Sequence, residues 1–299
     1  DIDGDGDLDV VFGGDSSTDE VWWWENPAPR FDPETPWTRR LIKDSGGRKH
    51  HDQLFGDFDG DGKTELVFWA QGDHELVMAE IPDDPHATGL WEQRAIYSWS
   101  DDSEMLQRGS YPGWRTINEH EGLAAADIDG DGITDILGGG RWFKHVDGVF
   151  RENIIDASYA FSRVAAAQFI EGGRPEVVLV VGDGLALLVM YEWRDGTWHP
   201  EILVEEVDNG HSIATGDFNG DGHADLFNAE MNLGRNDDAR SLILFGDGRG
   251  NFTVTTAIEG FGLHESRIAD LDGDGDYDIL GKPYKWQAPR LDIWLNQSR

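Results

Sequence analysis

Short apolar runs recur along the chain and are broken by glycine and aspartate. Runs such as TELVFWA (64–70) and ELVMAEI (75–81) are rich in β-branched and aromatic residues, which is typical of β-strands. The longer apolar stretch 177–191 is interrupted by Gly182-Asp183-Gly184, which predicts a hairpin turn. A membrane span needs about 18 to 20 consecutive apolar residues. We therefore expect an all-β protein without membrane insertion.

A nine-residue acidic phrase occurs five times, as DIDGDGDLD, DFDGDGKTE, DIDGDGITD, DFNGDGHAD and DLDGDGDYD. Each copy has oxygen-bearing side chains at positions 1, 3, 5 and 9, and glycines at positions 4 and 6 that allow a tight reversal. Turn-forming residues alone would explain one copy, but not five in the same register. The phrases predict about five structural Ca²⁺ sites, with these ligands: Asp1, Asp3, Asp5, Asp9, Asp57, Asp59, Asp61, Glu65, Asp127, Asp129, Asp131, Asp135, Asp217, Asn219, Asp221, Asp225, Asp270, Asp272, Asp274 and Asp278.

The surroundings of each acidic phrase are also repeated. An apolar run precedes the phrase, a strand-like run follows it, and two further strand-like stretches come next, such as EVWWWEN and WTRRLIK. Each unit thus supplies about four strands, and the cation loop joins the first strand to the second. Four-stranded units repeated at this period predict a β-propeller.

The spacing of the phrases predicts six units. The long interval between Asp127 and Asp217 contains a unit that keeps its strands but has lost the aspartates, so we expect this blade to lack calcium. The interval before Asp127 contains an insertion at about 100–118, which is too long for a plain connection and is a candidate functional loop. The first unit lacks its first strand. We predict a single propeller domain over 1–299, with N-terminal strands missing and seven blades in the complete protein.

Charge and composition narrow the classes of function. The chain has 59 acidic and 24 basic residues, a formal net charge of −35, and no cysteine. Nucleic-acid binding is not expected, because it needs a basic face. Disulfides, thiolate zinc sites and cysteine nucleophiles are excluded. With 38% hydrophobic residues, including 13 Trp and 14 Phe, the chain can form a large core, and much of the acidity lies in the repeated phrases.

Four of the ten histidines precede an acidic phrase by six or seven residues: His51, His120, His211 and His264. This position is the start of the first strand, which lines the channel of a propeller. The four imidazoles are therefore expected to converge at the rim opposite the cation loops, with Arg163 at the equivalent place in the unit that lost its aspartates. Converging imidazoles and carboxylates suit Zn²⁺, Mg²⁺ or another second divalent metal. The alternative is that the histidines merely hydrogen-bond to neighbouring blades.

The loops between the second and third strands are predicted to open on the same rim. Their polar residues and the rim histidines form the candidate catalytic set: His51, His120, His211, His264, Glu230, Arg163, Lys282 and Tyr284. The candidate substrate-binding set is Arg141, Trp142, His145, Trp286 and Arg267. Several acidic residues flank the histidines: Asp52, Glu119, Glu121 and Glu265. Aromatic faces beside carboxylates and arginines suit a sugar, and a metal with an acid and a base could promote β-elimination.

The acidic phrases resemble the FG-GAP or VCBS repeat of calcium-binding propellers, which occurs in integrin α-subunit heads, fungal lectins and carbohydrate-active lyases. The resemblance covers nearly the whole chain and implies the fold rather than the function. Segments such as HHDQ and EHEGLAAADIDGDG also resemble the propeller part of aldos-2-ulose dehydratases, which eliminate water from keto-sugars and carry cupin-like domains after the propeller. That resemblance implies that the four rim histidines lie in or beside the site. No cupin-like portion follows Arg299.

Two functions follow as hypotheses. The first is a carbon–oxygen lyase, a dehydratase that acts on a carbohydrate such as a keto-sugar or uronate by metal-assisted β-elimination. The alternative is a non-catalytic calcium propeller that binds a glycan or a protein. Calcium loops of weak affinity are typical of extracellular modules, so we expect a secreted or periplasmic location, although no leader is visible.

Overall fold

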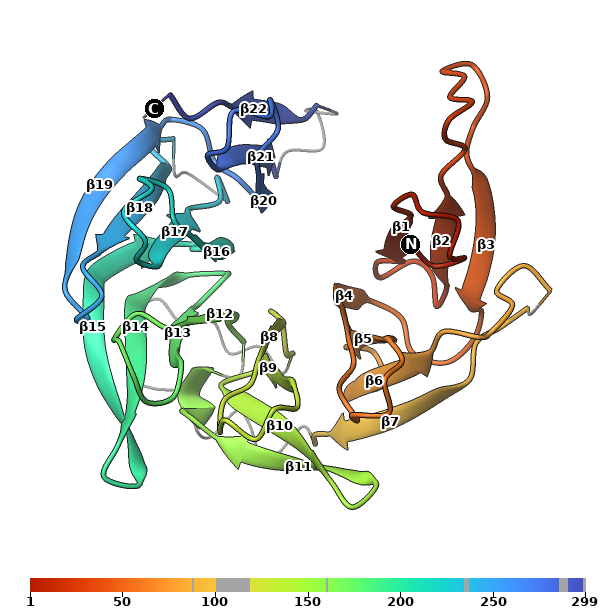
Figure 1. Cartoon of the computed structure of the whole chain (residues 1–299), viewed down its shortest axis with the longest axis horizontal. Coiled ribbons are helices and arrows are strands. Elements are labelled where there is room, and N and C mark those ends of the chain that lie inside the picture. Colours follow the sequence, from red (N-terminus) through yellow and green to blue (C-terminus); the bar gives the residue numbers. More distant parts are fainter. Residues whose placement is uncertain (88, 101–118, 160, 234–236, 285–289, 298–299) are drawn as a thin grey trace.

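The computed structural model describes residues 1–87, 89–100, 119–159, 161–233, 237–284 and 290–297. Their strands form six sheets arranged in an arc around a common axis, as the blades of a β-propeller (Figure 1). Among these residues, four sheets have four strands, and the first and last sheets have three. The predictions of an all-β propeller and of six units are confirmed. A seventh blade stays a prediction.

The strands of each blade follow one another in sequence. Blade 1 contains β1 (Val10–Gly13), β2 (Val21–Glu25) and β3 (Thr38–Lys43). Blade 2 contains β4 (His50–Gly56), β5 (Glu65–Ala70), β6 (Glu75–Glu80) and β7 (Gln93–Ser98). Blade 3 contains β8 (Ala124–Ala126), β9 (Asp135–Gly138), β10 (Arg141–Val146) and β11 (Val149–Ile154).

The remaining strands belong to three further blades. Blade 4 contains β12 (Arg163–Ala167), β13 (Glu176–Val180), β14 (Leu185–Arg194) and β15 (Thr197–Asp208). Blade 5 contains β16 (Ser212–Gly216), β17 (Asp225–Ala229), β18 (Arg240–Gly246) and β19 (Phe252–Glu259). Blade 6 contains β20 (Glu265–Ala269), β21 (Asp278–Lys282) and β22 (Asp292–Trp294). A short 3-10 helix, η1 (Ala157–Tyr159), precedes β12.

All strand pairs within the blades are antiparallel, and neighbours in sequence are neighbours in the sheet. The inner strands β4, β8, β12, β16 and β20 lie nearest the axis (Figure 1). Each acidic phrase of blades 2, 3, 5 and 6 joins the inner strand to the second strand, as predicted. In blade 1 the acidic phrase leads directly into β1, which therefore takes the place of a second strand.

The core lies between the blades. Every residue of β5, β13 and β17 is buried, because a propeller blade packs its two faces against two neighbours. Trp23 of blade 1, for example, packs in one cluster with Leu66 and Phe68 of blade 2.

Blade 4, without the aspartates, has four strands and the predicted hairpin between β13 and β14. In the part of the chain that the structure describes, no helix is long and apolar enough to cross a membrane.

Candidate functional site

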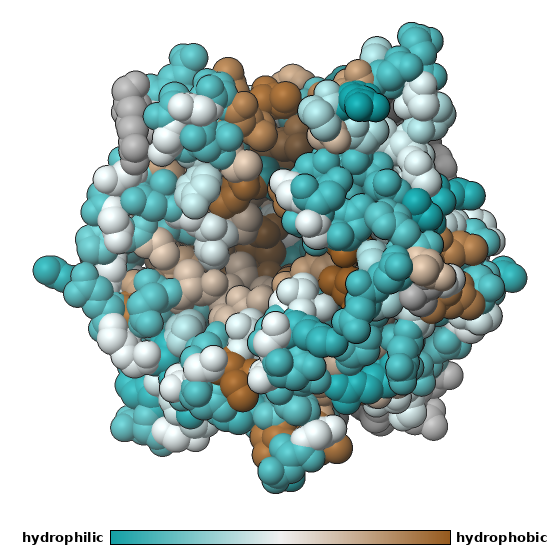
Figure 2. All heavy atoms as spheres, turned by 45° about the vertical axis from the view of Figure 1, so that its right-hand side comes forward, coloured by the Kyte–Doolittle hydropathy of each residue, from teal (hydrophilic) through white to brown (hydrophobic). Residues whose placement is uncertain are grey.

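The inner strands enclose a cavity of about 280 Å³ near the axis. Its apolar lining residues include Leu54, Leu123, Val164, Ile213 and Ile268 from five blades, and Figure 2 shows hydrophobic side chains gathered where the molecule is hollowed. Its polar lining residues are Asp52, Gln53, Arg163, Ser266 and Arg267. Each of these lies near the start of an inner strand, so the polar groups are concentrated at the end of the cavity where the rim histidines were expected.

Glu121 is the centre of the polar cluster at this rim. Its Oε1 atom lies 3.1 Å from His51 Nδ1, 3.1 Å from His211 Nε2 and 3.3 Å from Arg163 Nη1. The Glu121 side chain is 2% exposed, so these cations replace water around the carboxylate. Residues from blades 2, 3, 4 and 5 are thereby joined at one carboxylate. We call His51, Asp52, Glu121, Arg163, His211, His264 and Glu265 the axial cluster.

Arg163 links the axial cluster to two more carboxylates. Its Nη1 atom lies 3.0 Å from Asp52 Oδ1, and its Nη2 atom lies 2.5 Å from Glu265 Oε1. Asp52 also accepts a hydrogen bond of 2.8 Å from the backbone N–H of Gly122. Arg163 is nearly buried and is held from several sides, so it is a positioning cation for the cluster.

Both ring nitrogens of His211 face hydrogen-bond acceptors. Nδ1 lies 2.6 Å from the carbonyl oxygen of His264, and Nε2 faces Glu121. Only the protonated imidazolium can donate at both positions. Burial lowers the pKa of His211, but the Glu121 carboxylate outweighs burial and raises it above its ordinary value. Burial likewise opposes ionisation of Glu121, but the imidazoles of His211 and His51 hold the pKa of this carboxyl well below its ordinary range.

His51 and His264 have opposite environments. Burial lowers the pKa of His51, but Glu121 outweighs burial and raises it, while the side chain remains 26% exposed. His264 stacks on the His211 ring at 4.2 Å between centroids. Burial and the positive charge of His211 lower the pKa of His264 to about 3, so this imidazole is neutral at ordinary pH. The cluster therefore combines two imidazoles of raised pKa, His51 and His211, with one of lowered pKa, His264.

His120 lies away from the axial cluster. Its side chain is fully buried between blades, with ring centroids 5.0 Å from Trp69 and 4.2 Å from Trp99. His51, His211 and His264 each precede their acidic phrase by six residues, whereas His120 precedes its phrase by seven. Successive side chains of a strand point to opposite faces, so the extra residue turns His120 away and brings Glu121 to the axis. The expected convergence of four histidines is thus a convergence of three with Glu121.

Several other predicted site residues also lie away from the axis. Glu230 is buried and forms an ion pair of 2.6 Å with Arg240. Trp142 packs in the core between blades 3 and 4, and Arg141 is buried against Glu152. These side chains extend between strands and blades instead of over the rim.

The remaining predicted residues divide between the two rims. His145 follows Lys144 on β10, at the end near the cation loop of blade 3, because β10 begins at the histidine rim and runs away from it. Tyr284 lies 5.4 Å from the His264 ring, and Lys282 accepts the backbone N–H of His264 through its carbonyl oxygen. Trp286 and the insertion at 101–118 lie outside the described residues.

The axial cluster does not fit a second divalent metal well. One donor atom from each of His51, Asp52 and Glu121 lies within 4.8 Å of the others, which would suit a cation. However, the buried Arg163 guanidinium is in contact with both carboxylates of this set, at 3.0 and 3.3 Å. A metal would have to replace a cation that already neutralises its ligands. The arrangement favours acid–base chemistry by the imidazoles.

The cation loops carry donor atoms that fit a cation. In the second loop, Glu65 Oε2 accepts the N–H of Phe58, while Glu65 Oε1 is buried without a hydrogen-bond partner. In the third loop, Asp129 Oδ1 is likewise buried without a partner. Burial raises the pKa of Glu65 to about 7. A buried oxygen of this kind is stabilised when it binds a cation such as Ca²⁺, so the calcium expectation is compatible with these loops.

Position 9 of each phrase also has a backbone role. Asp225 accepts hydrogen bonds of 2.8 Å from the N–H groups of Phe218 and Gly246. The same position in blade 4, which lost the other aspartates, retains Glu176, and this residue accepts the N–H groups of Phe169 and Ile170 at 2.9 Å. The acid at position 9 therefore closes the turn whether or not the rest of the donor set is present.

Blade 3 differs from the other blades beside its cation loop. Lys144 Nζ contacts both Asp129 and Asp131, which occupy positions 3 and 5 of the phrase. The residues of blade 1 and blade 2 at the corresponding end of the third strand are Glu25 and Glu80. The third loop thus has an internal cation close to its predicted calcium ligands.

Comparisons with known proteins identify the repeat. The FG-GAP-like repeat family model matches residues 1–68 and 173–227. The match covers less than half of the chain, so it shows similarity to FG-GAP-like repeats in these segments, while the six sheets show the β-propeller fold. Among solved structures, the chain is similar to AofleA from Arthrobotrys oligospora, at 9% identity and a TM-score of 0.46, over 98% of this chain and 90% of that chain. At this level the likeness says nothing about function. A search of curated proteins returned no match.

Proposed function

We propose that the protein is a carbon–oxygen lyase, a dehydratase that acts on a small keto-sugar or uronate at the axial cluster. The observation that carries this proposal is the pair of imidazoles with oppositely shifted pKa values, His51 and His264, in the axial cluster, whose members Asp52 and Arg163 line the cavity. Elimination needs one group that accepts a proton and another that donates one. Environments that push two pKa values apart provide such a pair.

The reaction assigns one role to each imidazole. Neutral His264 accepts the proton from the carbon next to the substrate carbonyl, and the electron pair of that C–H bond forms a C=C bond. As the C–O bond at the β-carbon breaks, protonated His51 donates its proton and the leaving group departs as water. Glu121 stabilises the positive charge on His51 through the contact of 3.1 Å with its Nδ1 atom. Because elimination of water involves no net oxidation or reduction, this reaction needs no external oxidant or reductant.

Cavity size and charge favour a small carbohydrate. About 280 Å³ is close to the lower end of the roughly 300–1,000 Å³ typical of ligand pockets, which suits a single sugar. Arg267 lines the cavity and its side chain is 70% exposed, so it is available to a ketone or carboxylate oxygen. Tyr284 is 39% exposed beside His264 and offers a ring face to the sugar.

Calcium in the acidic loops belongs to the same proposal as a structural component. The loops lie at the opposite end of the inner strands from the axial cluster, so Ca²⁺ would stabilise the blades without touching substrate. Loops of this kind commonly bind calcium at extracellular concentrations. We place the protein outside the cytoplasm on this basis, as a secreted or periplasmic enzyme.

The experiment is a turnover assay with keto-sugars and uronates, followed by absorbance of the α,β-unsaturated product. We expect His51→Ala and His264→Ala each to lower kcat by about 10²- to 10⁴-fold, with KM changed much less. His145→Ala is the matched control, because His145 lies on β10 at the cation-loop end of blade 3, away from the axial cluster, and its loss should leave turnover unchanged. Parent-like kcat in both axial variants would overturn the proposal.

A non-catalytic binding propeller is the alternative outcome. It is favoured by the dense ion pairing of Glu121 and Arg163, which would also occur in a purely structural cluster. Saturable sugar binding by the parent protein without any unsaturated product, and unchanged in His51→Ala, would support that alternative.

A further inference from the structure

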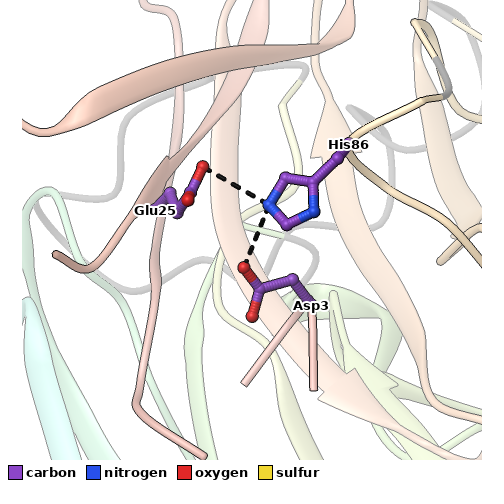
Figure 3. A group of neighbouring side chains, drawn as sticks. All are labelled: Asp3, Glu25 and His86. Atoms are coloured by element: carbon purple, nitrogen blue, oxygen red, sulfur yellow. Dashed lines mark ion pairs between the residues drawn. The ribbon is translucent and has the colours of Figure 1, made fainter. Parts of the chain in front are cut away.

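Three side chains from two blades meet beside the first cation loop. Asp3 belongs to the loop, Glu25 ends β2, and His86 belongs to the connection after β6 (Figure 3). His86 Nε2 lies 3.1 Å from Asp3 Oδ2 and 3.4 Å from Glu25 Oε2. Donor atoms of all three residues lie within 4.8 Å of one another. We call these residues the blade 1–2 cluster.

The geometry suits a shared metal better than an ion pair. An imidazole Nε2 carries at most one hydrogen, so it can donate a straight hydrogen bond to only one carboxylate. In this cluster two carboxylates lie at nearly equal distances from that atom. Ligands about 2.0–2.1 Å from a tetrahedral zinc ion are separated from each other by roughly 3.3 Å. The two separations from His86 Nε2, 3.1 and 3.4 Å, match that value.

Neighbouring groups hold the donors in place. The backbone N–H groups of His86 and Ala87 donate to Asp84 Oδ1 at 3.1 and 3.0 Å, which fixes the turn that carries the imidazole. The imidazole lies 6.0 Å from the ring of the buried Trp23. The Asp3 side chain is 3% exposed, and its Oδ1 atom accepts the N–H of Asp5. A metal site of this kind needs little rearrangement.

Electrostatics also allow a cation. Arg40 donates to Glu25 Oε2 from Nη2 at 2.8 Å and from Nε at 3.1 Å, and among the described residues Glu25 is the member of the cluster with which it pairs. The side chain of Arg40 is 32% exposed, in contrast with the buried Arg163 that joins the carboxylates of the axial cluster. The first loop contributes further acidic residues: Asp1, Asp5, Asp7 and Asp9. The surroundings thus remain anionic with Arg40 present.

The nitrogen donor sets this site apart from the oxygen donors of the acidic phrases. Calcium prefers oxygen ligands, whereas imidazole together with carboxylates suits zinc and similar metals. In blade 3 the residue at the corresponding end of the third strand is Lys144. Its ammonium contacts the acidic loop, so this position holds a cation and not a metal ligand. Blade 1 has Glu25 there, and blade 2 adds His86 from across the blade interface.

We propose that the blade 1–2 cluster binds a divalent metal of the zinc class through Asp3, Glu25 and His86, with water completing the coordination. The metal joins the first blade to the second, shares Asp3 with the first acidic loop and is distinct from the axial cluster. The proposal does not depend on the lyase function, because none of its ligands faces the cavity.

The test measures Zn²⁺ binding by equilibrium dialysis with and without Ca²⁺, because Asp3 also belongs to the first acidic loop and Ca²⁺ bound there would compete for it. The proteins are the full chain, His86→Ala and the control His199→Ala, in which a half-buried histidine on β15 is removed. We expect His86→Ala to bind one fewer Zn²⁺ per chain, or to bind it at least 10-fold more weakly, and His199→Ala to match the parent. Zn²⁺ should raise the melting temperature of the parent but not of His86→Ala.

Two results would overturn this inference. One is Zn²⁺ binding of equal number and affinity in the parent and in His86→Ala. The other is loss of that Zn²⁺ in His51→Ala with retention in His86→Ala, because the metal would then bind at the axial cluster. Co²⁺ absorption bands provide a check independent of stability, since loss of a nitrogen ligand changes the spectrum in His86→Ala alone.

Discussion

At the scale of single residues, one position decides which side chain reaches the axis. Glu121 precedes its acidic phrase by six residues, as His51, His211 and His264 precede theirs. The spacing is visible in the sequence, but the pattern of histidines draws attention to His120 instead. The position of Asp52, in contrast, does not follow from its spacing to an acidic phrase. Asp52 lies at a bulge in β4 and has a φ of 52°. The bulge places an additional acidic side chain at the rim, and no spacing rule predicts it.

Glu121→Gln tests the role of this residue. Removing the buried charge leaves His51, His211 and Arg163 without their shared carboxylate, so we expect a loss of about 3–5 kcal/mol in the free energy of unfolding. Urea titration at pH 6 measures it. Glu119→Gln is the matched control, because Glu119 pairs with Lys49 and is 28% exposed. A loss below 1 kcal/mol in Glu121→Gln would contradict the central place of this carboxylate.

The same cluster predicts the pH dependence of stability. The raised pKa values of His51 and His211 give stability that is complete below about 6.5 and is lost as pH rises through their folded values. The lowered pKa of Glu121 gives stability present above about 4.5 and lost as pH falls further. The cluster therefore contributes most between these limits. Melting temperatures from pH 5 to 9, with calcium present, should fall on the alkaline side in the parent and change less in Glu121→Gln. Parallel curves would contradict this assignment.

At the scale of elements, the acidic phrase combines a turn and a donor set. The acidic side chain at position 9 of the phrase accepts hydrogen bonds from backbone N–H groups. Blade 4 retains this acid as Glu176, although the other acidic positions are lost. The sequence correctly predicted four strands in blade 4. It did not reveal that one acid of the phrase serves the turn, because metal ligand and turn closure require the same residue type at the same place.

Glu176→Gln and Glu65→Gln separate the two roles. Glu176→Gln replaces the charged acceptor of the Phe169 and Ile170 N–H groups by a weaker, neutral amide oxygen, so we expect it to lower the free energy of unfolding by about 1–3 kcal/mol, equally in calcium and in EDTA. Glu65→Gln should cost more in calcium than in EDTA, because Glu65 Oε1 is the oxygen free to bind the cation. Urea titrations under both conditions give the comparison. A calcium-dependent effect of Glu176→Gln would show that blade 4 also binds a cation.

At the scale of the whole molecule, charge and assembly are linked. The net charge of −35 is concentrated partly in loops at one end of the inner strands, where unliganded carboxylates repel each other. The core lies between blades, so each blade is stabilised by its neighbours. Cations that bind single loops should therefore stabilise the complete propeller.

Removal of calcium tests this coupling. We expect EDTA to lower the melting temperature of the complete protein, since each loop at 100 times its Kd contributes about 2.7 kcal/mol. Calorimetry with and without excess Ca²⁺ measures the shift, and NaCl at matched ionic strength controls for general screening. An unchanged transition, or full recovery with NaCl alone, would contradict specific cation sites.

The sequence by itself determined the strands, the six units and the positions of the acidic loops, because these depend on local patterns repeated along the chain. It also indicated which segments reach the rim. Only the tertiary structure decided that Glu121 replaces His120 at the axis, that Arg163 occupies the space between two carboxylates, and that His86 meets Asp3. These contacts join residues of different blades, and their distances depend on strand register, bulges and blade packing rather than on spacing within a repeat.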